Sequence, residues 1–132
     1  MDWSRYPIPA MRLEQRFGDR LVLAFCERPT SVWQMVADAA AKHPAREALV
    51  CDTTRLNWAE VAQRSQRIAE GFRKLGLKRG ERVALLLGNR IEFPLILFAA
   101  AHQGLVTVLL GTRQQKPEIA YVLSDWRKGS DS

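Results

Sequence analysis

Residues 57–88 decide the fold, and they read NWAEVAQRSQRIAEGFRKLGLKRGERVALLLG. In the first half of this stretch, apolar or small residues recur every three or four positions, which predicts one amphipathic helix over residues 58–75. Asn57 and Glu60 form a capping box at its start, and Gly76 supplies its stop. The stripe expected to face the core comprises Val61, Ser65, Ile68, Phe72 and Leu75.

The second half of the stretch begins an α/β pattern. The run RVALLLG (82–88) is continuously apolar, which is typical of a strand buried on both faces in a parallel sheet. A helix that begins after Asn89 is then predicted to continue through residues 95–103 and to end at Gly104, and residues 105–110 predict another buried strand. This order of helix, strand, helix and strand favours an α/β fold with a mostly parallel, buried sheet.

Two hairpins are expected before this unit. Alternating runs within residues 11–25 surround Phe17-Gly18-Asp19, which predicts the first hairpin. The apolar EALVC (47–51) and the extended residues 55–57 surround a polar turn, which predicts the second.

Helix boundaries follow from cap and proline chemistry. Thr30 or Ser31 caps a helix that runs to about Lys42. Asn89, with Glu92 three residues later, is the expected cap of the helix that continues through residues 95–103, and Pro117 suits the first position of a last helix.

Composition excludes some classes of function. The 132 residues are 47% hydrophobic with a net charge of +6, which fits one globular domain. No run of five Lys/Arg residues occurs, so a nucleic-acid binder is the least favoured reading. The apolar stretch 93–111 is long enough for a membrane span, but His102-Gln103-Gly104 interrupts it. The N-terminus lacks an apolar signal region, and we expect a cytoplasmic protein without a membrane span.

Few residues suggest chemistry. Cys26 and Cys51 lie in apolar stretches and are expected to be buried thiols, and neither they nor the two histidines show ligand spacing. His43 falls on the packed face of its helix, which favours a structural role. The loop GLKRGE (76–81) could attract a phosphate, but ordinary turn glycines explain it better. We therefore predict no catalytic, cofactor-binding or metal-binding residue.

The ordered motifs nevertheless resemble the N-terminal region of the AMP-forming acyl-CoA synthetases and adenylating enzymes. LNWAEV (56–61) is similar to the family's L-[TS]-Y-x-E-L, and GLKRGERVA (76–84) is similar to G-[VL]-x-x-G-D-R-V-A. The further matches are Asn89, Glu92 and Phe93 to N-x-x-E-F, residues 100–106 to A-x-x-x-G-x-V, and residues 117–123 to the following helix. Leu109-Leu110-Gly111 departs from the usual Pro-Leu-[ND].

The resemblance implies a partial acyl-CoA-synthetase-like N-terminal domain. It implies a truncated fragment of an AMP-dependent fatty-acid or carboxylic-acid–CoA ligase, whose parent reaction makes an acyl-adenylate and then an acyl-CoA. The full-length family uses ATP, Mg²⁺ and CoA, but its phosphate loop and catalytic lysine belong to later segments. We expect this fragment to use no cofactor and to be inactive; the alternative is a stand-alone binding or protein-interaction module that keeps the fold.

The expected domain division has three parts: an N-terminal hairpin extension (1–28), an incomplete N-terminal domain (29–125) and a non-native tail (126–132). The tail WRKGSDS replaces the family's expected strand, and a shifted reading frame permits G-A-[KR]-A-L-I there. We hypothesise a frameshift near codon 126, which the nucleotide sequence tests directly.

A domain cut short in this way would expose apolar core surface and a strand edge. Such surfaces favour association, so a homo-oligomer is expected.

Overall fold

The computed structural model describes residues 7–128, with side chains through residue 125. The chain divides into two compact units, with the boundary between Thr30 and Ser31. The first unit contains β1 (Met11–Arg16) and β2 (Arg20–Phe25). The elements of the second unit are, in order, α1 (Val32–Lys42), β3 (Glu47–Cys51), β4 (Thr54–Asn57), α2 (Trp58–Lys74), β5 (Arg82–Leu85), α3 (Glu92–Gln103), β6 (Val106–Leu109) and α4 (Lys116–Lys128).

The first unit is the hairpin predicted over residues 11–25. β1 and β2 pair antiparallel, with Met11 opposite Phe25 and Arg16 opposite Arg20. Phe17 and Gly18 both have positive φ, 52° and 84°, which lets the chain reverse between the strands. Because side chains alternate along a strand, β1 carries its charged residues on one face and Met11 and Leu13 on the other.

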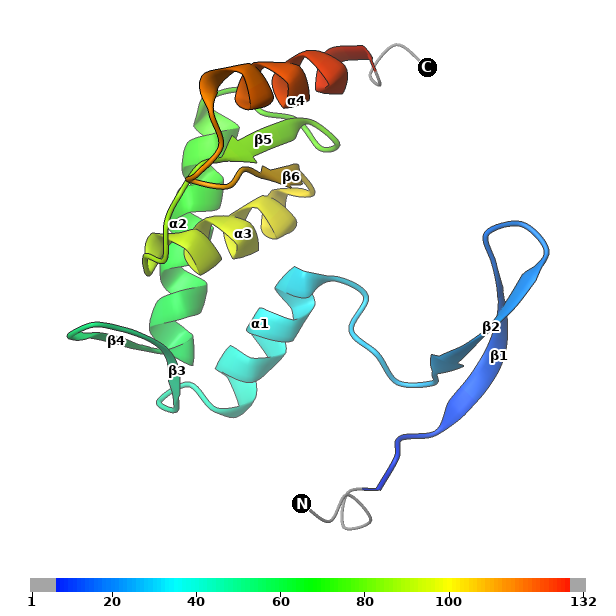
Figure 1. Cartoon of the computed structure of the whole chain (residues 1–132). Helices are drawn as coiled ribbons and strands as arrows, with labels where there is room; N and C mark the ends of the chain where they lie inside the picture. The colour runs from blue at the N-terminus through cyan, green and yellow to red at the C-terminus, as the bar shows by residue number, and fades with distance from the viewer. Residues whose placement is uncertain (1–6, 129–132) are drawn as a thin grey trace. The chain divides into compact units, whose positions relative to one another are not determined.

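The second unit holds the predicted α/β pattern. β5 and β6 pair parallel, from Arg82 opposite Val106 to Leu85 opposite Leu109, and α3 forms the crossover between them. Figure 1 shows the long α2 beside α3, and α3 in turn contacts β6. The second predicted hairpin is also present, as the antiparallel pair of β3 and β4.

The sheet is smaller and more open than predicted. β5 covers 82–85 rather than 82–88, and β6 covers 106–109 rather than 105–110. Burial on both faces is wrong, because Leu86, Val106 and Leu109 are 48%, 48% and 55% exposed. The physical reason is that this sheet has two strands in the described part of the chain, so each strand keeps an open edge.

The core lies where α1, α2 and α3 meet. Its buried residues are Val36, Leu56, Val61 and Leu95, with Trp33, Trp58 and Phe98 among the half-buried residues packed around them. The predicted stripe of α2 is correct for Val61 and Ser65, which are fully buried.

Leu75 was wrongly assigned to that stripe. It is 78% exposed, because α2 ends at Lys74 and the chain turns away at Gly76, whose φ is 82°. The stripe also includes Ala69, 1% exposed, since residues 61, 65 and 69 follow one another at four-residue steps on one face of α2.

Most predicted caps are confirmed. Of the two candidates before α1, Ser31 is the cap, and its Oγ accepts a hydrogen bond from the Gln34 backbone at 3.1 Å. Gly104 ends α3 in the left-handed conformation, with φ at 71°.

Two helix starts differ from the prediction. The cap residue of α3 is Ile91, without a side-chain bond, so the assignment of Asn89 is wrong. α3 starts at Glu92, so its cap position is residue 91 and Asn89 lies two residues before it. α4 begins at Lys116, which places Pro117 second rather than first.

The capping box of α2 supplies a stability prediction. The Asn57 side chain accepts a bond from the Glu60 amide, and the Glu60 carboxylate accepts one from the Asn57 amide, each at 2.9 Å. Asn57→Ala removes the first bond and is expected to lower the free energy of unfolding by about 1 kcal/mol. Urea denaturation followed by tryptophan fluorescence measures this, and an unchanged midpoint would contradict it.

Three further expectations concern cysteines, the tail and the membrane. Cys26 and Cys51 are free but half-buried rather than buried, because the strands beside them keep an open face.

α4 continues to Lys128, so residues 126–128 are helical where no regular element was expected, and residues 129–132 of the proposed tail lie outside the described residues. Among the described helices, none has the length and apolar character to cross a membrane.

Candidate functional site

The motif LNWAEV (56–61) is used for folding. Leu56 and Val61 are buried in the core, and Trp58 packs against them. The polar side chains of Asn57 and Glu60 bond to each other's backbone amides. The motif therefore joins β4 to α2 and presents no side chain for chemistry.

The glycine loop 76–81 is not a phosphate-binding loop. The Lys78 amide donates to the Glu81 carboxylate at 2.7 Å, and the Gly80 amide donates to the Gly104 carbonyl at 2.9 Å. The amides of residues 76, 77 and 81 also donate to carbonyls within the chain. Because a phosphate cradle needs free amides, the alternative of turn glycines is supported.

The histidines do not form a catalytic pair. His102 packs edge-on against Trp33, with ring centroids 4.4 Å apart. His43 is exposed at the end of α1, where its amide donates to the Ala39 carbonyl. His43 is therefore not packed as predicted, because α1 ends at Lys42 and leaves the His43 side chain exposed.

Mg²⁺, which the family resemblance implies, prefers several carboxylate oxygens. Within residues 7–128, no three His, Cys, Asp or Glu side chains gather closely enough to hold a metal ion.

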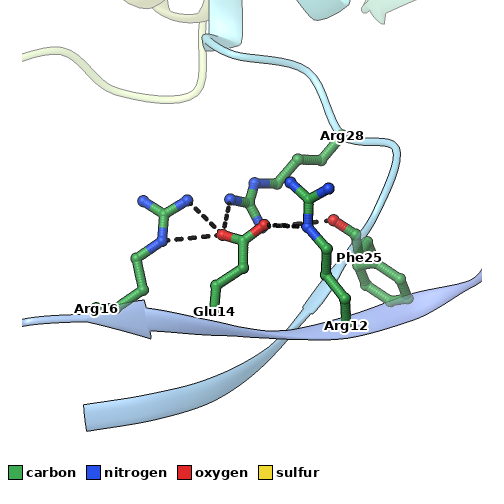
Figure 2. Close-up of polar contacts among 5 residues, drawn as sticks. All are labelled: Arg12, Glu14, Arg16, Phe25 and Arg28. Carbon is green, nitrogen blue, oxygen red and sulfur yellow. Dashed lines mark hydrogen bonds and ion pairs between the residues drawn. The ribbon is translucent and has the colours of Figure 1, made fainter. Parts of the chain in front are cut away.

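The densest polar cluster lies on the hairpin, and the sequence analysis missed it (Figure 2). Arg12, Glu14 and Arg16 alternate along β1 and so share one face. Arg12 Nε donates to one Glu14 oxygen at 2.8 Å, and Arg16 Nη2 donates to the other at 2.8 Å. Arg28, beyond β2, reaches that second oxygen at 2.5 Å. We call Arg12, Glu14, Arg16 and Arg28 the arginine cluster; the signal for it was the R-x-E-x-R alternation.

Hydrogen bonds from Arg28, Arg16 and Arg12 lower the pKa of Glu14 to about 2. The Glu14 hydrogen bond in turn raises the pKa of Arg12. Because the Glu14 pKa is lowered, its stabilising effect is complete above its ordinary value of 4.5 and is lost as the pH falls toward about 2. Glu14 therefore stays ionised near neutral pH.

A pocket of about 420 Å³ lies beside this cluster within the first unit. Its lining comprises Arg12, Arg16, Cys26, Arg28, Pro29 and Thr30. The Glu14 side chain, 14% exposed, is enclosed by its three arginine partners, whose side chains are 35% to 63% exposed. Guanidinium groups rather than carboxylates therefore line the pocket.

Comparison with known proteins assigns the second unit to a protein family. A family model described as AMP-binding enzyme matches residues 36–127. The long-chain-fatty-acid–CoA ligase FadD13 of Mycobacterium tuberculosis is 36% identical over 93 residues, which are 69% of this chain and 18% of FadD13. The 2,3-dihydroxybenzoate-AMP ligase of Bacillus subtilis is 34% identical over 87 residues, 66% of this chain and 16% of that enzyme.

Solved structures of the same family have the fold of this chain. A Mycobacterium tuberculosis fatty acyl CoA synthetase superposes with a TM-score of 0.70 at 33% identity, over 72% of this chain and 19% of that one. The N-terminal domain of FACL13 from the same organism superposes with a TM-score of 0.70 at 32% identity, over 74% of this chain and 25% of that one. This chain thus spans less than a fifth of the curated relatives' length and matches solved N-terminal domains. By its fold, its ordered motifs and these matches, the chain belongs to the AMP-binding enzyme family.

Proposed function

We propose that this chain forms the first α/β layer of the N-terminal domain of an AMP-forming acid–CoA ligase and has no ligase activity of its own. The relatives that it matches are named as acyl-CoA ligases and AMP ligases. The observation that carries the proposal is that the matched motif residues bond to one another, in the α2 cap and in the 76–81 loop. Residues engaged in this way hold a fold together and leave substrate chemistry to other segments.

The open sheet supports the same role. Leu86, Val106 and Leu109, next to or within the paired strands, are each about half exposed. Apolar surface of this kind is normally covered by further elements. A first layer awaiting neighbouring segments would carry such a surface, whereas a finished small domain would bury it.

The proposal extends to cofactors and location. The chain alone would need no ATP, Mg²⁺ or CoA, which serve the complete reaction. We also place it in the cytoplasm, where the free thiols Cys26 and Cys51 would stay reduced.

The overall ligation reaction tests the proposal. The purified 132-residue chain, incubated with ATP, Mg²⁺, CoA and fatty acids of graded length, is expected to form no acyl-CoA above the buffer background. A full-length relative assayed in parallel confirms that the reagents are competent. Acyl-CoA formed in proportion to the chain's concentration would contradict the proposal.

We further propose that the open sheet makes the isolated chain a homo-oligomer. The chain has a mass of 15.0 kDa, and light scattering at micromolar concentration is expected to give at least twice that value. Leu109→Lys places a charge on the exposed part of β6 and is expected to return the mass to that of one chain. A monomeric parent chain would contradict this proposal.

The matched control is Leu75→Lys. Leu75 is 78% exposed, caps the end of α2 and belongs to neither strand of the parallel pair. The same added charge there is expected to leave the oligomer intact. Equal dissociation by both variants would show that net charge, rather than the sheet surface, governs association.

A further inference from the structure

We propose that the arginine cluster and its pocket bind the phosphate group of a small soluble ligand. This site lies within the first unit, before the residues matched by the family model (36–127). It therefore stands independently of the ligase proposal.

The hairpin builds the site from two segments. Arg12 and Arg16 project from one face of β1, and Arg28 approaches from the chain after β2 (Figure 2). Arg16 lies opposite Arg20 in the strand register, which adds a further cation to the same face. Glu14 holds three guanidinium groups in one place, so the positive charge is arranged before a ligand arrives.

Charge at the site is unbalanced in favour of an anion. Three guanidinium groups surround one carboxylate, and Glu14 stays ionised because its pKa is lowered to about 2. Both Glu14 oxygens already accept hydrogen bonds, so this carboxylate is engaged with its partners. Binding of an additional anion would reduce the excess positive charge at the cluster.

The arginines retain donors for that anion. The bond of Arg12 to Glu14 uses Nε, and a guanidinium has five N–H donors in a fixed fork. Arg12 and Arg16 are 63% and 50% exposed and line the pocket of about 420 Å³. Planar forks of this kind suit the paired oxygens of a phosphate, which carries more charge than a carboxylate.

The test is a titration of the whole chain with inorganic phosphate and with a phosphate monoester, followed by amide NMR shifts at constant ionic strength. Saturable shifts at Arg12, Arg16 and Arg28 are expected for both ligands, and chloride at the same ionic strength should produce none. Phosphate shifts spread evenly over the basic surface, or no saturable shift, would overturn the proposal.

Arg12→Gln is the informative variant, because Arg16 and Arg28 still hold Glu14 and the hairpin when Arg12 is replaced. It is expected to weaken phosphate binding roughly tenfold. Arg12→Lys keeps the charge but loses the fork, so it should recover part of the affinity. The hairpin amide shifts in the ligand-free variants verify that the fold survives.

The matched control is Arg55→Gln, which removes the same charge from the other hairpin. Arg55 is 65% exposed and paired with Glu47 at 2.6 Å. Its replacement should leave phosphate affinity unchanged, and equal weakening by both variants would overturn the site. Binding to vesicles with phosphate headgroups, without binding to either soluble ligand, would replace the proposed ligand with a lipid surface.

Discussion

Leu56→Ala is expected to lower the free energy of unfolding by about 2–5 kcal/mol. Leu56 is 2% exposed and lies in the core with Val36, Val61 and Leu95, so truncation leaves a cavity among three helices. Its place at the end of β4 also makes it the link between the second hairpin and that core. Urea denaturation measures the change, and Trp33 and Trp58, both packed on the core, report it by fluorescence.

Leu75→Ala is the matched control, with the same atoms removed from a side chain that is 78% exposed. Its effect should stay within about 0.5 kcal/mol. If the two alanine variants were equally stable, Leu56 would not occupy the core position described.

Gly104→Ala is expected to lower the free energy of unfolding by about 1–2 kcal/mol, because Gly104 has a φ of 71°. A Cβ there would also lie 2.9 Å from Arg79 Cγ, so the Arg79 side chain would have to move. The Gly104 carbonyl accepts the Gly80 amide, which couples this turn to the loop before β5.

Gly71→Ala is expected to raise the free energy of unfolding, the opposite of the Gly104→Ala effect. Gly71 lies inside α2, has ordinary helical geometry, and a Cβ there meets nothing within 4 Å. Alanine should therefore stabilise the chain by about 0.5–1 kcal/mol. Thermal unfolding of both variants measures the difference, and stabilisation by both substitutions would contradict the left-handed turn at Gly104.

Local chemistry was sufficient to predict much of this fold. The start of α2, its capping box and the stop of α3 at Gly104 depend on neighbouring residues, and each is confirmed. The parallel pairing of β5 and β6 followed from two apolar runs joined by a helix, because a right-handed crossover is the usual solution.

Features that depend on distant segments were harder to predict. An apolar run such as 82–88 looks the same whether or not neighbouring strands cover it, and here Leu86 is exposed. Asn89 had the right residue type for a cap, but α3 begins three residues later at Glu92. Periodicity also extended the core stripe of α2 to Leu75, which is exposed because α2 ends at Lys74.

The arginine cluster also combines residues that are close in the sequence with one that is distant. Arg12, Glu14 and Arg16 are close in sequence, and their alternation on a strand could have placed them on one face. Arg28 is different: its approach to Glu14, fourteen residues away, depends on the path of the chain after β2. The net charge of +6 is a sum over the whole sequence, so it does not show that these residues lie together.

ATP–pyrophosphate exchange tests the central claim most directly, because it isolates adenylation from the later transfer to CoA. The 132-residue chain, with Mg²⁺, ATP, labelled pyrophosphate and a range of fatty acids, is expected to give the rate of the protein-free control. Exchange that requires both the chain and an acid substrate would contradict the claim that this layer has no adenylating chemistry of its own.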